Sequence, residues 1–354
     1  MPSAVPTGPA SPGVPARERR FYLEQFTGRT LVIARAAGSP ADVAPHAEPV
    51  DALVADLVAE GVRVVLVQPG GRVAHLQPDD AGVVAVWRQL RRHGRMRIAL
   101  PDDHDILRTA VRLAARLRAF KLVLVSPTAV RPTPESRPAS FVSLDAAHAD
   151  GEGLAALAAE ALAGGVATVN VCHPADIAEE LLTYAGAGTC YTLGDYCRVE
   201  RVGIDDYDGV ADLIAHGVEE GYLKPREPDA VAQLIVNGYG ARVGDHHLAG
   251  FAALLTEPYA REGLGEVCAL TTISRFAGEG VGSQIVDAML RDAADRGLAG
   301  VFACTTAEPA ARFFRRLGFV EVPQAELPAA KWDGYEPDRR TSLRCFLHQL
   351  VMLG

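Results

Sequence analysis

Five short apolar runs, each followed by a helical pattern, constrain the fold of the first half of the chain more than any other feature. These runs are rich in Val, Ile and Leu and cover residues 30–38, 62–71, 97–101, 121–127 and 166–174. Helical periodicity follows them at residues 50–60, 83–93, 105–119, 153–163 and 176–184. Such runs are typical of buried parallel strands joined by helical crossovers. The pattern therefore predicts an α/β sandwich with a mostly parallel sheet.

The rhythm of strands and helices changes near residue 199, which predicts a domain boundary there. A chain of 354 residues is long enough for about two domains. Residues 1–20 are rich in Pro, Ala and Ser and lack an apolar signal segment, so we expect a disordered tail. The predicted domains then span residues 21–198 and 199–354. In the second domain we expect a helix from Asp205 or Asp206, strands at 246–257, 264–274 and 298–306, and helices at 281–296 and 310–316.

The composition argues against several classes of protein. A net charge of -9 gives no basic field for nucleic acid, and no apolar run is long enough to cross a membrane. The six cysteines show no C-x-x-C spacing, which argues against zinc and against a disulfide framework. We therefore expect a cytoplasmic protein with no metal. The acidic stretch "DDHD" at 102–105 is better explained as the start of a helix than as a metal site.

The segment "RFAGEGVGSQIVDAML" at 275–290 places glycines at alternate positions between a predicted strand and a helix. Backbone N–H groups and the positive end of a helix dipole at such a place attract an anion. The spacing G-x-G-x-G differs from the dinucleotide-binding G-x-G-x-x-G, and no phosphate-loop motif with its lysine occurs in the chain. The segment therefore predicts a pyrophosphate that is bound and not cleaved. Four residues of the helix should form one buried stripe: Val281, Ile285, Met289 and Ala293.

"RFAGEGVG" resembles the Q/R-x-x-G-x-G/A motif of the GNAT family of N-acetyltransferases, with Arg275, Gly278 and Gly280 at the motif positions. "ARFFRRLGF" at 311–319 resembles the second landmark of that family, a helix ending in x-x-x-G-F. The resemblance implies an α+β GNAT domain at the C-terminal end, with acetyl-CoA as cosubstrate. The implied cofactor-binding residues are Leu270, Thr271, Thr272, Ala277, Gly278, Glu279, Gly280, Val281 and Gly282.

The C-terminal segment 326–350 is similar to the ending of bacterial N-acetylglutamate synthases, L-P-x-x-K-x-x-x-Y-N-x-x-R-R-S. The matching residues are Leu327, Pro328, Lys331, Tyr335, Arg339 and Arg340. Glu336 stands where these synthases have Asn, and the spacing to Ser342 differs slightly. Arg226 in "GYLKPREP" matches an arginine of their basic segment. A dicarboxylic acceptor such as L-glutamate needs cationic partners, and the resemblance assigns that role to Arg226, Lys331, Arg339 and Arg340.

The resemblance also implies catalytic roles. Glu266 is at the position of a glutamate that serves as base in the synthases, through a water molecule. Backbone N–H groups near Leu270 and Thr271 would meet the oxyanion. Many acetyltransferases have a tyrosine that serves as general acid at the position that Phe314 occupies here. Phenylalanine cannot donate a proton, so Thr305, Thr306 and Tyr335 stay open as candidates for the general acid. A CoA thiolate could also leave with little help. A cysteine of the synthases falls on Ala269, whereas this chain has Cys268 one position earlier.

The first domain resembles the amino-acid-kinase-like domain of the same synthases, most specifically at "FYLEQF", residues 21–26. The lysine and the aspartate of active kinases are missing in "ARAAG" at 34–38 and "VSPTAV" at 125–130. We therefore expect a shortened, degenerate domain without phosphoryl transfer. The favoured role of this domain is structural: it forms the contacts of a homo-oligomer. The alternative is that it binds arginine as an inhibitor.

Three hypotheses about function follow. The first is transfer of acetyl from acetyl-CoA to L-glutamate, as in arginine biosynthesis. The second keeps the fold and cosubstrate but takes a different amino acid or a small amine as acceptor, because Cys268 and Glu336 depart from the synthase pattern. The third is a non-catalytic sensor of acetyl-CoA or of an amino acid.

Overall fold

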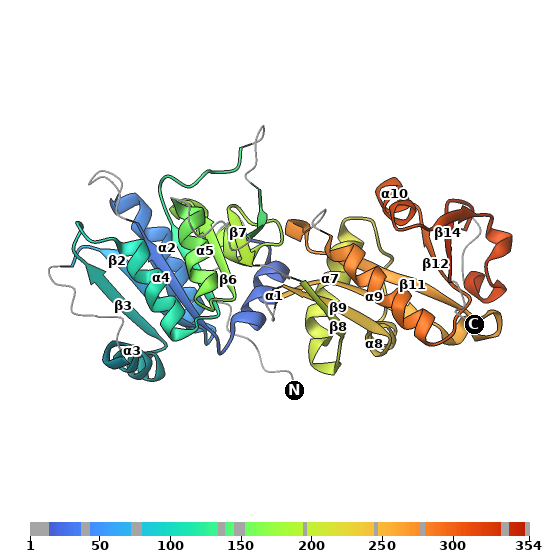
Figure 1. Cartoon of the computed structure of the whole chain (residues 1–354), viewed down its shortest axis with the longest axis horizontal. Helices are drawn as coiled ribbons and strands as arrows, with labels where there is room; N and C mark the ends of the chain where they lie inside the picture. The colour runs from blue at the N-terminus through green and yellow to red at the C-terminus, as the bar shows by residue number, and fades with distance from the viewer. Residues whose placement is uncertain are drawn as a thin grey trace. The chain divides into compact units, whose positions relative to one another are not determined.

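The computed structural model describes residues 14–36, 43–71, 80–133, 139–144, 153–193, 197–243, 247–276, 280–333 and 340–350. The chain divides into two compact units (Figure 1). Unit 1 extends to Tyr196 and includes residues 244–246, and unit 2 holds Cys197–Val243 and His247–Gly354. The division falls two residues before the boundary that the sequence predicts.

Unit 1 is built on a seven-stranded sheet with the strand order β3-β2-β1-β4-β6-β7-β5. The five predicted strands are all present and run parallel to one another. Strands β7 and β5 were not predicted, and β7 pairs antiparallel with β6. The strands are β1 (Thr30–Arg35), β2 (Arg63–Pro69), β3 (Arg95–Leu100), β4 (Lys121–Val125), β5 (Phe141–Leu144), β6 (Thr168–Cys172) and β7 (Thr189–Leu193).

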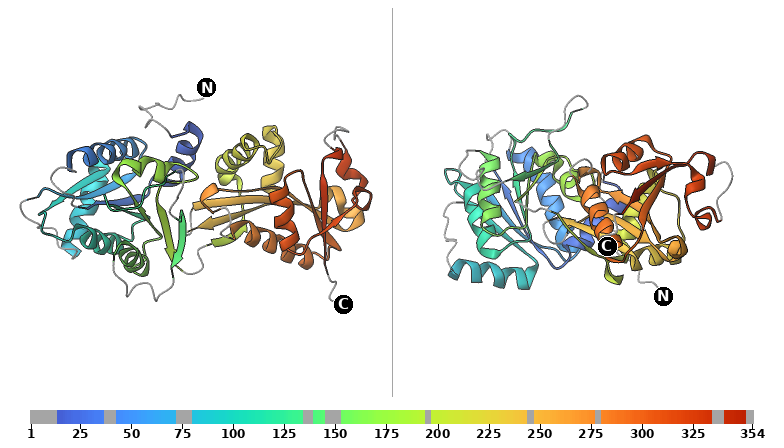
Figure 2. Two further views of the ribbon diagram at one scale, coloured as in Figure 1. Left: turned by 90° about the horizontal axis from the view of Figure 1, so that it is seen from above. Right: turned by 45° about the vertical axis from the view of Figure 1, so that its right-hand side comes forward.

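Helices cover both faces of this sheet, as the buried strand runs require. The views in Figure 2 agree that α2 and α6 cover one face, and α4 and α5 the other. Alternate residues of the central strands, such as Val32 and Val65, join α3, α4 and α5 in one apolar core. The helices are α1 (Ala16–Phe26), α2 (Val43–Ala59), α3 (Asp80–His93), α4 (Ile106–Leu117), α5 (Leu154–Ala163) and α6 (Ile177–Leu182). The "DDHD" stretch behaves as predicted, because Asp105 caps α4 by accepting a hydrogen bond from the Arg108 N–H at 3.0 Å.

Helix α1 corrects the predicted tail. It begins at Ala16, so residues 16–20 are helical; residues 1–13 lie outside the described part of the chain. The aromatic side chains of "FYLEQF" are buried, and the ring of Phe21 lies edge-on to that of Tyr184 with centroids 5.1 Å apart. The N–H of Tyr184 also donates a hydrogen bond to Glu18 at 2.6 Å. The helix is therefore part of the core of unit 1.

Unit 2 is built on a second seven-stranded sheet, with the order β13-β14-β12-β11-β10-β9-β8. All neighbouring strands are antiparallel except β11 and β12. The strands are β8 (Cys197–Arg201), β9 (Gly238–Val243), β10 (His247–Leu255), β11 (Leu264–Thr272), β12 (Gly300–Thr305), β13 (Val320–Val322) and β14 (Arg344–Gln349). Strands β10, β11 and β12 were predicted; β8, β9, β13 and β14 were not.

Helix α9 covers one face of the second sheet and lies opposite α7 and α8 (Figure 2, left). Its predicted stripe of Val281, Ile285, Met289 and Ala293 is fully buried, which confirms which side of the helix faces the sheet. The helices of unit 2 are α7 (Tyr207–Glu219), α8 (Pro228–Val236), α9 (Val281–Asp295) and α10 (Glu308–Arg316). No helix in the described ranges of either unit combines the length and apolarity that a membrane span requires.

Candidate active site

In the glycine segment, residues 281–290 form the first part of α9, and Arg275 and Phe276 belong to the short helix Ser274–Phe276. Gly280 precedes the helix with a φ of +84°, a left-handed conformation that favours glycine. The first turn carries no acidic side chain, so no carboxylate of that turn opposes an anion at the free N–H groups of this helix end. Ala277, Gly278 and Glu279 lie outside the described residues; Val281 is buried and Gly282 follows it in the first turn. The helix start therefore presents free N–H groups and the positive end of the helix dipole, which favour an anion; the pyrophosphate itself stays a prediction.

Strand β11 leads toward this loop and separates from β12 on the way. The parallel pairing ends at Glu266 and Phe302, although β11 continues to Thr272. Its register with β10 shifts between Phe251 and Ala253, and Ala269 has a φ of +54° at this bulge. A bulge re-aims neighbouring groups and is common beside active sites. From Val267 onward, the edge of β11 that faced β12 is unpaired among the described strands. Leu270, Thr271 and Thr272 lie on this open stretch.

Glu266 is at the point where the two strands separate, and its carboxylate is buried in unit 2. Lys331 Nζ donates to Glu266 Oε1 at 2.5 Å, and the Tyr259 hydroxyl donates to Oε2 at 2.5 Å. The Glu266 and Lys331 side chains are only 8% and 6% exposed, so the ion pair is shielded from solvent. Lys331 comes from the short helix Ala329–Trp332 and Tyr259 from the connection Glu257–Glu262. Two predicted residues are thus in direct contact, through a pairing that the sequence did not predict.

Arg226 lies on the same side of the site. Its Nη2 donates to the sulfur of Cys268 at 3.0 Å, while its Nε is buried without a hydrogen-bond partner. Cys268 is two positions after Glu266 on β11 and is close enough for Glu266, Arg226 and Lys331 all to act on its charge. Burial and the Glu266 carboxylate raise the pKa of the Cys268 thiol, while Arg226 and Lys331 oppose that shift. The structure therefore brings Arg226, Glu266 and Lys331 together around one strand.

The remaining predicted residues are less central. The Thr305 hydroxyl accepts a hydrogen bond from the Ala307 N–H at 3.0 Å, and Thr305 alternates with Cys304, so its side chain points to the other face of β12. Arg340 is exposed; its guanidinium lies 4.5 Å from the centre of the Trp332 ring, and its Nε donates to Gln324 at 3.2 Å. Thr306 is exposed. Tyr335 and Arg339 lie outside the described residues.

Two groups in the site were missed from the sequence. Tyr259 lies in a stretch that the sequence predicts only as a connection between strands, and no pattern there indicates a hydrogen-bond partner for Glu266. Cys304 and Cys345 come from different strands and meet at a sulfur–sulfur distance of 3.6 Å. Both missed groups pack with Phe302 and Leu327 in the apolar cluster beside Glu266. Only the register of β12 and β14 reveals the cysteine pair.

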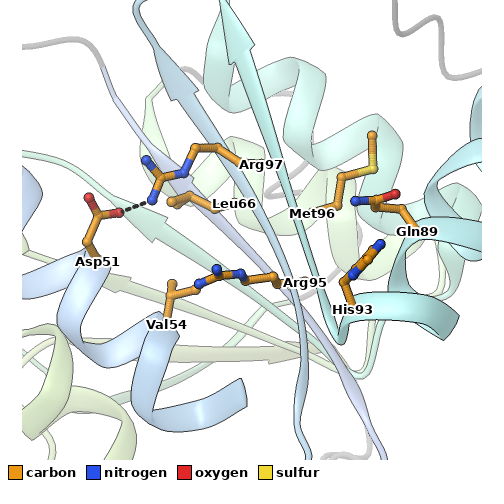
Figure 3. A pocket seen from close by; sticks show the side chains of 8 residues that line it. All are labelled: Asp51, Val54, Leu66, Gln89, His93, Arg95, Met96 and Arg97. Atoms are coloured by element: carbon orange, nitrogen blue, oxygen red, sulfur yellow. Dashed lines mark hydrogen bonds and ion pairs between the residues drawn. The ribbon is translucent and has the colours of Figure 1, made fainter. Parts of the chain in front are cut away.

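Unit 1 has a hollow of about 540 Å³ that contains none of the predicted site residues (Figure 3). Arg97 donates to Asp51 across it at 2.8 Å, and the two form an ion pair between β3 and α2. The hollow is lined by Asp51, Val54, Leu66, Gln89, His93, Arg95, Met96 and Arg97. The predicted site residues that the structure describes all lie in unit 2.

Comparison with known proteins defines the class of unit 2. Residues 217–319 match the sequence profile of the Acetyltransferase (GNAT) family. This range contains Arg226, Glu266, the glycine segment and α9. Unit 2 therefore contains a GNAT acetyltransferase domain.

Among curated proteins, the chain is similar in sequence to amino-acid acetyltransferases. The chain is 30% identical over 185 residues to the amino-acid acetyltransferase of Ralstonia nicotianae, covering 51% of this chain and 40% of that protein. It is 29% identical over 189 residues to that of Pseudomonas putida, covering 52% of this chain and 43% of that protein. The matched region thus spans less than half the length of these curated relatives.

A solved structure resembles the chain over both units. The N-acetylglutamate synthase from Neisseria gonorrhoeae complexed with coenzyme A and L-arginine superposes with a TM-score of 0.58 at 19% identity. The match covers 94% of this chain and 98% of that one. At this level of identity the likeness establishes the fold, and it confirms the predicted combination of an α/β sandwich with a GNAT domain.

Proposed function

We propose that this protein transfers the acetyl group of acetyl-CoA to the α-amino group of an amino acid, with L-glutamate as the acceptor. The observation that carries the proposal is the buried contact of Glu266 with Lys331, beside Arg226 and the open edge of β11. The GNAT domain and the amino-acid acetyltransferase relatives support the reaction type. The glutamate assignment rests on the cationic residues Arg226 and Lys331, which suit a dicarboxylic acceptor.

Acetyl-CoA supplies the activated thioester, and the chain's own groups have three tasks. The N–H groups at the start of α9 hold the pyrophosphate, and N–H groups of β11 near Leu270 and Thr271 meet the oxyanion. Glu266 takes the proton that the acceptor's ammonium must lose before its nitrogen attacks. An ionised carboxylate has about four lone-pair positions, so Glu266 can accept from a bridging water while Tyr259 and Lys331 occupy two others.

Lys331 has a double role in this proposal. In the absence of acceptor its charge is matched by Glu266 at 2.5 Å. A carboxylate of the acceptor competes for the same ammonium group, and Arg226 offers a second cation with a buried, unpartnered Nε. Binding of a dicarboxylic acceptor then loosens the hold of Lys331 on Glu266 and leaves the base more free to accept a proton.

Release of CoA thiol from acetyl-CoA, measured across a panel of amino acids and small amines, tests the proposal. We expect glutamate-dependent release that falls by about 10²–10⁴-fold in Glu266→Gln. Glu262→Gln, which changes an exposed glutamate of the preceding connection, is the matched control and should keep full activity. If CoA thiol is released only with another amine, that amine replaces glutamate as the proposed acceptor. If the protein binds acetyl-CoA but no acceptor leads to release of CoA thiol, the enzyme hypothesis is wrong and the sensor hypothesis remains.

A further inference from the structure

Cys304 and Cys345 lie directly opposite each other in the antiparallel pairing of β12 with β14. Their sulfur atoms are 3.6 Å apart, and both residues are free thiols. Opposite residues of antiparallel strands have the Cα separation that a disulfide requires. The two cysteines are therefore placed for bond formation without rearrangement of the strands.

The surroundings of the pair favour reaction at sulfur. Cys304 donates its S–H to Cys345, and this hydrogen bond lowers the pKa of the Cys345 thiol against the opposing effect of burial. The nearby Lys331 ammonium lowers the same pKa further. The same hydrogen bond and burial raise the pKa of the Cys304 thiol. Cys345 thus has the greater thiolate character and is itself buried, whereas Cys304 is partly exposed and is the side from which an oxidant reaches the pair.

We infer that Cys304 and Cys345 are an oxidisable dithiol whose conversion to a disulfide switches off the reaction at Glu266. The first part of this inference, disulfide formation, stands on geometry alone. The second part rests on the proposed acetyl-transfer function.

The chemistry balances with a hydroperoxide as oxidant. The Cys345 thiolate attacks one peroxide oxygen, the O–O bond breaks, and the departing oxygen takes up a proton. The Cys345 sulfenic acid then reacts with the Cys304 sulfur, which forms the S–S bond and releases the sulfenic oxygen as water. With hydrogen peroxide, two thiols and one peroxide give one disulfide and two waters. A dithiol reductant reverses the change by thiol–disulfide exchange.

The disulfide would disturb the site because the pair shares its packing with the catalytic groups. A disulfide bond is about 2.0 Å long, so the sulfurs must move together by about 1.6 Å from their distance of 3.6 Å. Cys345 packs in the apolar cluster that contains Tyr259, Phe302 and Leu327, and the charges of Lys331 and Glu266 act on both sulfurs. Close-packed interiors transmit such movements to their neighbours. The hydrogen-bonded geometry of Glu266 depends on these same neighbours.

The test uses the full chain, reduced and then treated with hydrogen peroxide. We expect the loss of two free thiols, an intact mass lower by two hydrogen atoms, and a peptide that links Cys304 to Cys345. Acetyl transfer should fall by about tenfold or more, because small displacements of catalytic groups are costly. Dithiothreitol should restore both the thiols and the rate. A linkage to Cys268, or no linkage at all, would overturn the inference.

Variants separate this inference from the proposed function. Cys304→Ala and Cys345→Ala should each abolish the linkage and make the acetyl-transfer rate insensitive to peroxide. Cys190→Ala, which changes a buried cysteine of unit 1, is the matched control and should keep the peroxide response. If the buried Cys345→Ala variant does not fold, the partly exposed Cys304 carries the test.

Two further outcomes are distinct. If the reduced protein shows no acetyl transfer but peroxide still links Cys304 to Cys345, the dithiol is supported and the proposed function is refuted. Linkage without any change in the rate of an active protein refutes the switch.

Discussion

Glu266 shows at the scale of single residues how a buried charge is retained in this fold. Its carboxylate has two donors, Lys331 and Tyr259, and both donors are almost fully buried. Burial of an ion pair costs desolvation energy that only close contact and additional hydrogen bonds offset. The Tyr259 hydroxyl supplies such a bond. The stability of unit 2 and the placement of the proposed base therefore depend on the same contacts.

Lys331→Met should destabilise unit 2, because it leaves the Glu266 carboxylate buried without its cation. We expect a loss of about 3–5 kcal/mol in the free energy of unfolding. Urea unfolding followed by the fluorescence of Trp332, in a Trp87→Phe background, measures it. The double variant Glu266→Gln/Lys331→Met should lose less than the single one, since no buried charge remains unpaired. A loss below about 1 kcal/mol, as for exposed pairs, would contradict the prediction.

Tyr259→Phe removes the hydroxyl that holds Glu266 Oε2 and keeps the ring, whose centroid lies 4.9 Å from that of Phe302. Because Tyr259 acts through Glu266, we expect kcat for acetyl transfer to fall by about tenfold while KM for the amino acid stays the same. Steady-state kinetics with varied acceptor checks this. Tyr222→Phe, at a tyrosine that is 61% exposed, should change neither constant. A change confined to KM would instead assign Tyr259 to acceptor binding.

At the scale of elements, strand β11 and helix α9 together form the candidate cofactor site. The strand loses its partner β12 after Glu266, bulges at Ala269 and leads into the glycine segment. The helix that follows starts at a glycine with positive φ and has no acidic residue in its first turn. Each feature alone has a structural explanation. Their order along the chain places an open strand edge and a helix N-terminus one after the other.

Gly280→Ala should weaken CoA binding by placing a side chain at a φ of +84° where α9 starts. The backbone strain costs about 1–2 kcal/mol, and relief of that strain moves the N–H groups. Gly297→Ala is a matched control at the other end of α9, with a φ of +72° and no atom near the added Cβ. Both variants should lose similar stability, but only Gly280→Ala should raise the Kd for CoA in calorimetric titration. Equal affinities would argue against a cofactor role for the helix start.

At the scale of the whole molecule, the two units differ in what they retain. Unit 2 has a GNAT profile and a cluster of charged groups. For unit 1, the sequence predicts a degenerate kinase-like domain that lacks the lysine and the aspartate of active kinases. Arg35 ends β1 in the segment where active kinases of this fold carry a lysine, and it is buried. A structural role for unit 1, as part of a homo-oligomer, is the proposal that fits these residues.

Addition of ATP, Mg²⁺ and either glutamate or N-acetylglutamate should therefore release no ADP. The physical reason is the missing lysine and aspartate in "ARAAG" and "VSPTAV", since phosphoryl transfer depends on charges positioned around the phosphates. A coupled ADP assay on a preparation that is active in acetyl transfer measures this. Substrate-dependent ADP release would show that unit 1 keeps a catalytic site.

Local patterns were sufficient to predict much of the fold. The five parallel strands of unit 1 and the buried stripe of α9 follow from hydrophobic periodicity, which depends only on neighbours along the chain. Strands β5, β8 and β13 lie at sheet edges and escaped prediction because edge strands have weak patterns. Strands β7, β9 and β14 lie inside the sheets, and their pairing partners are not visible in a local pattern. Likewise, the sequence pointed to Glu266, Lys331 and Arg226 separately, by resemblance.

The sequence by itself determined the order of strands and helices, the glycine loop and the residue types that can do the chemistry, because these are properties of local segments. Only the tertiary structure decided which groups meet. Lys331 reaches Glu266 across 65 positions, Cys304 faces Cys345 across 41, and Tyr259 enters the site from a connecting turn. Such contacts depend on sheet register and close packing, and one-residue slips in register would separate them all.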